Sequence, residues 1–218
     1  PLRRQRQMCI RDRLKTLEEP ADKVVLLLTA DALENLLPTI VSRCEVIRLR
    51  PSSLKEARTY LQSEHGISSE KASLFAHLTS GRIGAAITMA EDPDALSTRE
   101  SHLRDFLSLL PASRYERFKL ANALSKPYDK ARENVGEVLP IWLSFWRDVF
   151  VRASGAELPL VNLDFEDQID LIAEKIDPKT ARELVITHEN AFGQLDAYAN
   201  ARLLVETLML KWPYINVG

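Results

Sequence analysis

The sequence contains little that could support a disulfide framework, a zinc site or a membrane span. It has two cysteines, Cys9 and Cys44, among 218 residues, which is too few for a set of disulfides or a four-ligand zinc site. It contains no glycine-rich phosphate-binding loop followed by a pair of acidic residues. No apolar run approaches the roughly 18 residues of a membrane-spanning helix. The sequence therefore predicts a soluble globular chain that cannot bind and hydrolyse ATP unaided.

A catalytic constellation is also missing. The four histidines are scattered without metal-ligand spacing, and each is expected at the surface or its boundary: His65, His77, His102 and His188. An acidic cluster lies where a helix is expected to start: Asp164, Glu166, Asp167 and Asp170. Favourable interaction with the helix N-terminus accounts for that cluster. We expect no metal site.

The first 13 residues have an unusual origin on our interpretation. PLRRQRQMCIRDR reads codon for codon as a translated sequencing adapter, so we exclude residues 1–13 from functional reasoning. On this view the natural chain is longer and begins upstream of Leu14. Without this segment the chain has 24 basic and 30 acidic residues. Such a balance argues against non-specific nucleic-acid binding and favours protein partners.

Periodicity predicts a mainly helical chain. Pro51, Ser52 and Ser53 precede a helix over Leu54–His65, which Gly66 can terminate. A second helix opens at Ser68–Ser69 and a third after Ser80–Gly81, giving three short helices up to about residue 91.

The half of the chain after residue 96 is helical by the same criterion. Trp142 and Trp146 lie on a helix that is apolar around most of its circumference, so we expect both in a core or a subunit interface. A loop follows from Ser154 to Asp164, and the last helix is expected over Leu195–Lys211. Leu208 on that helix is a candidate for an exposed apolar contact residue.

One arginine stands where a short amphipathic turn meets a β-like run. The segment Leu36–Leu49 reads LLPTIVSRCEVIRL, with Arg43 near its middle. An arginine held on a rigid element suits an arginine finger, because its planar and permanently charged guanidinium can reach a nucleotide on a neighbouring subunit. Taken alone, Ser42–Cys44 also fits a solvated arginine beside a buried cysteine.

The sequence around Arg43 resembles a known family. LKTLEEP at Leu14–Pro20 is followed by the apolar run Val24–Leu28, by Thr29, and then by the segment that contains Arg43. In this order the parts are similar to the end of the AAA+ domain in clamp-loader subunits of bacterial DNA polymerase III, most of all the delta-prime group. The resemblance covers residues 14–92 strongly and residues 93–218 more loosely.

The resemblance implies roles for particular residues. Arg43 corresponds to the finger that acts in trans, and Thr29 to a sensor residue at a strand tip. In the ATP-hydrolysing members a second sensor arginine occupies the position of Gly84, whereas Arg82 here lies two residues earlier, about 200° away around a helix. This departure favours delta-prime, whose own site is commonly inactive. The plainer interpretation of Gly84 is close packing against a neighbouring helix.

The last helix carries a further likeness. NARLLVE from Asn200 to Glu206 resembles the Asn-x-Arg-Leu-x-x-Glu signature of the clamp-loader collar, which implies that Asn200, Arg202 and Glu206 serve oligomerisation. Arg202 and Glu206 are four residues apart, so an intrahelical ion pair worth a few tenths of a kcal/mol is the plainer interpretation.

These features predict a mainly α chain with four parts. They are the adapter at residues 1–13, the end of an AAA+ α/β domain with about two strands at 14–51, a three-helix lid at 52–92, and an all-α collar at 96–218. The resemblance implies a subunit of the polymerase holoenzyme that supplies Arg43 to a neighbouring ATPase and helps load a sliding clamp onto primed DNA.

The expected surroundings follow from the same resemblance. The chain itself holds no cofactor, while ATP and Mg²⁺ lie in the neighbouring subunit's site. The partners are the gamma/tau and delta subunits, with the clamp and primer-template DNA reached through a cytoplasmic complex and no membrane involved. Two alternatives stay open: a gamma/tau-type ATPase motor, or a helical scaffold with a non-functional AAA+ remnant.

Overall fold

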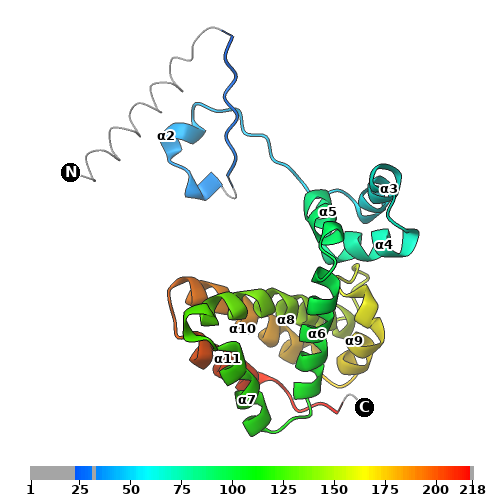
Figure 1. Ribbon diagram of the computed structural model, residues 1–218, viewed down its shortest axis with the longest axis vertical. Coiled ribbons are helices and arrows are strands. Elements are labelled where there is room, and N and C mark those ends of the chain that lie inside the picture. The colour runs from blue at the N-terminus through cyan, green and yellow to red at the C-terminus, as the bar shows by residue number, and fades with distance from the viewer. Residues whose placement is uncertain (1–22, 31–32, 217–218) are drawn as a thin grey trace, which may run out of the picture. The chain divides into compact units, whose positions relative to one another are not determined.

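The computed structural model describes residues 23–30 and 33–216, so the proposed adapter lies outside the described residues. The chain divides into two compact units between Arg50 and Pro51 (Figure 1).

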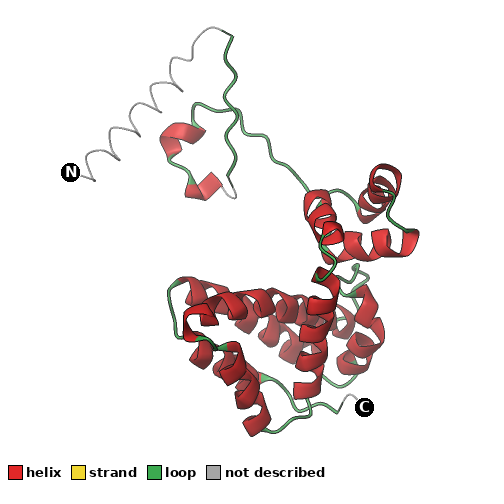
Figure 2. Ribbon diagram, in the orientation of Figure 1, coloured by secondary structure: helices red, strands yellow, loops and turns green. Residues whose placement is uncertain are grey.

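The first unit contains two short helical turns, η1 (Leu33–Asn35) and α2 (Pro38–Val41). The runs at 24–28 and 45–49 are extended, and no strand forms in the part of the chain that the structure describes (Figure 2). The expectation of about two strands is therefore wrong for these residues. A strand needs a hydrogen-bonded neighbour and a buried face, whereas Val25 is 83% and Leu49 is 92% exposed.

The second unit begins with three helices whose sequence signals match their ends. They are α3 (Leu54–His65), α4 (Ser69–Leu78) and α5 (Ile83–Glu91). A capping box between Ser53 and Glu56 starts α3, and Gly66 ends it with a left-handed φ of 62°. Leu61, Ala72, Phe75 and Ala86 form a small core between the helices. The assignment of these helices as a lid stays a prediction.

Six further helices build the larger core. They are α6 (Ala95–Leu109), α7 (Arg114–Leu124), α8 (Ala131–Ala153), α9 (Glu166–Ala173), α10 (Pro178–Asp196) and α11 (Ala201–Lys211), with short turns η2 (Tyr128–Lys130) and η3 (Leu163–Phe165). The prediction of a mainly α chain is confirmed.

Aromatic side chains fill the centre of this core. Trp142 and Trp146 of α8 are buried as expected, and α10 packs along α8. Phe106 of α6 lies edge-on to Trp212 with ring centroids 4.8 Å apart, and Trp142 lies 5.0 Å from the same indole. Such contacts add to the hydrophobic stabilisation because the ring edges and faces carry opposite partial charges.

The last helix is shorter than the sequence pattern predicts. The expected helix Leu195–Lys211 is interrupted, since α10 ends at Asp196 and α11 begins at Ala201. Tyr198 adopts a positive φ of 61°, and the amide of Ala199 bonds back to the carbonyl of Gln194 at 3.0 Å. This is the usual geometry of a helix C-terminus. The break places Asn200 at the start of α11 instead of inside a helix.

Candidate functional site

Arg43 lies on the surface, just after the single turn of α2. Pro38 occupies the first helical position, where its missing N–H costs nothing, and Ser42 ends the turn. The Arg43 side chain donates from Nη1 to the carbonyl of Thr39 at 2.8 Å, and its backbone N–H bonds to Ile40. A cation at this position is favoured by the exposed carbonyls of a helix C-terminus. The turn therefore fixes the place of an exposed guanidinium.

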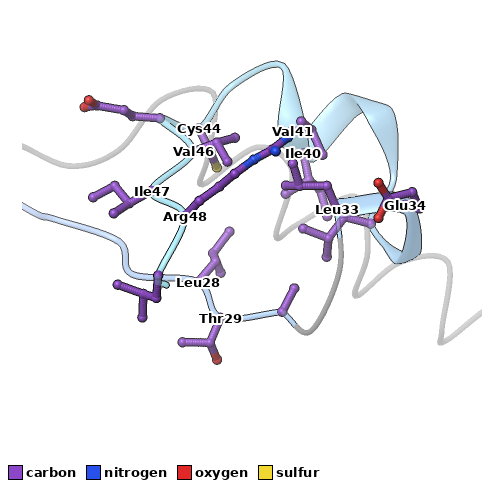
Figure 3. Close-up of a pocket in the computed structure, with 14 residues that line it drawn as sticks. Leu28, Thr29, Leu33, Glu34, Ile40, Val41, Cys44, Val46, Ile47 and Arg48 are labelled. Carbon is purple, nitrogen blue, oxygen red and sulfur yellow. The ribbon is translucent and has the colours of Figure 1, made fainter. Parts of the chain in front are cut away.

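A cavity of about 530 Å³ lies within the same unit. Its lining is mainly aliphatic and comes from residues 28–30, 33–34, 36, 40–41 and 44–49. Thr29 and Cys44 are among the residues that line the cavity, whereas Arg43 is not. The cavity therefore does not bring Thr29 and Arg43, the two predicted site residues of this segment, together. In Figure 3 the Arg48 side chain extends toward Val41 and Ile40.

Sequence reasoning missed Arg48 as a cavity residue. Alternation does not mark it, because every residue from Cys44 to Leu49 lines the cavity and the immediate neighbours of Arg48 are apolar. One arginine in an aliphatic lining does not make a phosphate site, and no glycine precedes Gly66 in the sequence. This cavity suits apolar groups better than a nucleotide.

Arg82 and Gly84 mark the start of α5. Arg82 is the exposed N-cap residue, and its backbone N–H bonds to Thr79 at 3.1 Å. The interpretation of Gly84 as a close-packing residue is wrong, since a Cβ there would meet nothing within 4 Å. Gly81 has that role instead. Its φ is +77°, and a Cβ would lie 2.0 Å from the carbonyl oxygen of Ser52.

The proposed oligomerisation residues all have local partners on α11. Asn200 caps the helix by accepting a bond from the amide of Leu203 at 3.1 Å. Arg202 donates from Nε to Glu206 at 2.8 Å. The expected intrahelical ion pair is thus present, while a role of these residues in oligomerisation stays a prediction.

The acidic helix start has specific partners that the sequence argument did not foresee. Asp164 pairs with buried Arg99 at 2.6 Å. Glu166 and Asp170 both pair with Arg152 of α8. Interaction with the helix N-terminus is therefore not a sufficient explanation for the cluster. These carboxylates fasten the start of α9 to α6 and α8.

His188 is fully buried, so its expected place at the surface or boundary is wrong. Its Nδ1 lies 2.7 Å from the carbonyl of Leu184, and its Nε2 lies 3.2 Å from Nε1 of Trp212. An indole N–H can only donate, so Nε2 accepts and Nδ1 carries the hydrogen. Burial lowers the pKa of His188 to about 4, although the bond to Leu184 acts in the opposite direction. The side chain is a neutral core residue.

No helix of the described chain combines the length and the apolar character that crossing a membrane requires.

Comparisons with known proteins point to one group. A sequence model of the family described as "DNA polymerase III, delta subunit" matches residues 12–53. DNA polymerase III subunit delta′ of Bacillus subtilis (strain 168) is 24% identical over 197 residues, which cover 90% of this chain and 59% of the relative. The chain is similar to delta-prime subunits of DNA polymerase III. The resemblance inferred from the sequence is confirmed.

The matched segment coincides with the part of the chain that carries Arg43. Thr29, Arg43 and the residues that line the cavity all lie inside residues 12–53. The delta-prime-like chain spans about three fifths of the length of its curated relative.

Proposed function

We propose that this chain belongs to a clamp-loader subunit that acts in DNA replication and supplies Arg43 in trans to the ATP site of a neighbouring subunit. The observation that carries this proposal is an exposed guanidinium at the end of a short turn, inside the segment that matches the delta-subunit family. An arginine in that setting can stabilise the charge that develops on the γ-phosphoryl group.

The proposed subunit works inside a larger assembly. Its partners are the gamma/tau and delta subunits, and through them the sliding clamp and primer-template DNA, in the cytoplasm. ATP and Mg²⁺ occupy the neighbour's site, so this chain contributes a group to hydrolysis without a complete site of its own.

Contact with sister subunits is expected on the exposed face of α11. Leu208 was the expected contact residue, but it is 2% exposed and belongs to the core. Leu203 and Leu210, seven residues apart, are 59% and 49% exposed. Residues seven apart lie on nearly the same face of a helix. A charge at either position should weaken assembly without opening the core.

The test of the finger replaces Arg43 in the full-length subunit and measures the reconstituted complex. Arg43→Ala removes the charge, whereas Arg43→Lys keeps it but loses the planar fork. Both variants should assemble normally, while DNA-stimulated ATP hydrolysis and clamp loading fall at least several-fold. An arginine finger supplied in trans is worth roughly 10³ to 10⁵ in turnover, and other intact sites in the complex would reduce the loss.

Arg50→Ala is the matched control, because Arg50 is an exposed arginine of the same segment. It should leave hydrolysis and loading unchanged. Normal loading by an assembled Arg43→Ala complex would reject the finger and favour the helical-scaffold alternative.

A further inference from the structure

The helices α3–α5 contact the helices α6–α11, with the turn η3, in at least two places. The first is the direct connection from α5 to α6, where Leu96 of α6 packs against the small core. The second is far away in sequence. His77, in the last turn of α4, has its Nδ1 2.6 Å from the carbonyl oxygen of Leu160, and α4 also contacts η3 (Figure 1).

The accepting atom, the carbonyl oxygen of Leu160, lies in a loop that is hydrogen-bonded to α8. Asp148 of α8 is fully buried, and its carboxylate accepts bonds from the amides of Val161 at 2.9 Å and Asn162 at 2.7 Å. On the other side, Arg147 donates to the carbonyl of Pro159 at 2.9 Å. The Leu160 carbonyl is thus held from both sides by side chains of α8. The hydrogen bond from His77 to this carbonyl therefore connects α4 to the larger core through a well-held loop.

The donor is equally well defined. A carbonyl oxygen only accepts, so Nδ1 of His77 carries the hydrogen. Both the neutral ring with its hydrogen on Nδ1 and the imidazolium can make this bond. His77 is half-buried, which limits the competition from water for the same hydrogen bond.

We propose that the His77–Leu160 hydrogen bond is a latch that holds α3–α5 and α6–α11 as one body. A single attachment at residues 92–94 allows one group of helices to turn against the other. A second attachment on a different helix removes that freedom. Loss of the latch leaves the contact between α4 and η3 without its hydrogen bond, so the two groups of helices turn more freely against each other. This inference does not depend on the proposed function.

Distances between two spin labels test the latch directly. In a Cys9→Ser, Cys44→Ser background, one label is placed at Ser63→Cys on α3 and the other at Asp167→Cys on α9, both exposed positions. The starting protein should give a narrow distance distribution. His77→Leu, which cannot donate, should broaden it at least twofold. His77→Asn should keep it narrow, because the amide nitrogen can take the place of Nδ1.

His65→Leu is the matched control. His65 ends α3, and its ring contact is with Tyr60 of the same helix, so this change should leave the distribution narrow. Helical circular dichroism checks that each variant is folded, and His77→Ala replaces His77→Leu if the leucine disturbs folding. A broad distribution in the starting protein, or a narrow one in folded His77→Leu or His77→Ala, would overturn the proposal.

Discussion

Residues 23–50 and residues 51–216 differ in what stabilises them. In the second region a large and a small apolar core are enclosed, and buried polar groups such as Asp148 and Arg117 are hydrogen-bonded. In the first region two aliphatic runs lie at the surface, and its longest described helix is one turn. Burial of apolar area is the main favourable term in folding. Residues 23–50 therefore gain less stability from apolar burial than residues 51–216 do.

The largest contrast should appear when one apolar side chain is truncated in each region. Phe106→Ala removes a buried ring that touches four other aromatic side chains, so we expect a loss of about 3–5 kcal/mol in unfolding free energy. Val25→Ala should change it by less than about 0.5 kcal/mol, since this side chain is already exposed. Chemical denaturation measures both. Similar losses in the two variants would show that Val25 is packed.

Lowering the pH should reduce the stability of the helical region by a smaller amount. The lowered pKa of His188 means that the unfolded chain binds a proton near its ordinary pKa of about 6.5, while the folded chain does so only near 4. Stability should therefore be fully present above pH 6.5 and fall as the pH drops toward 4. By linkage, the free energy of unfolding should fall by roughly 2 kcal/mol between pH 7.5 and pH 5 because of His188.

His188→Gln isolates this contribution, because a glutamine does not titrate and its amide oxygen can accept from Trp212. The pH dependence of the denaturation midpoint between 7.5 and 5 should flatten in this variant. An unchanged slope would mean that other groups cause the acid sensitivity.

The two glycines around the start of α5 give the smallest and most local test. Gly81→Ala forces a Cβ against the Ser52 carbonyl at a positive φ, so it should cost at least about 1–2 kcal/mol. Gly84→Ala meets open space on a helix and should stabilise by up to about 1 kcal/mol. Thermal melting compares them. Equal effects in the two variants would contradict the assignment of the close approach to Gly81.

Local signals in the sequence predicted the helix ends well. Ser53 and the left-handed Gly66 bound α3 where expected, because a cap involves residues only a few positions apart. The burial of Trp142 and Trp146 followed equally from an apolar helix pattern.

Long-range polar contacts could not be predicted in this way. Arg117 donates to the carbonyls of Leu110, Met209 and Trp212, partners up to 95 positions away. The burial of His188 depends likewise on Trp212, 24 positions away. Nothing in the neighbouring sequence marks such pairs. The break at Tyr198 was missed because a left-handed C-terminal residue is usually glycine.

The sequence predicted which segment carries the candidate site, but not how that segment folds. Sequence indicated the turn that carries Arg43, and the structure places that guanidinium on the surface. The extended runs on either side did not form the expected strands, because pairing depends on residues that periodicity cannot locate. Arg48 was missed as a cavity residue because the sequence pattern does not distinguish it from its apolar neighbours in the same extended run.

Amide hydrogen exchange on the chain tests the contrast between the two regions most directly. Amides of α8 and α10 should exchange only through global opening, because both helices are buried in the larger core. Amides at 24–30 and 45–50 should exchange close to the rate of an unstructured peptide. Slow exchange at 24–28, comparable to that of α8, would contradict the account by showing that the first region is stable by itself.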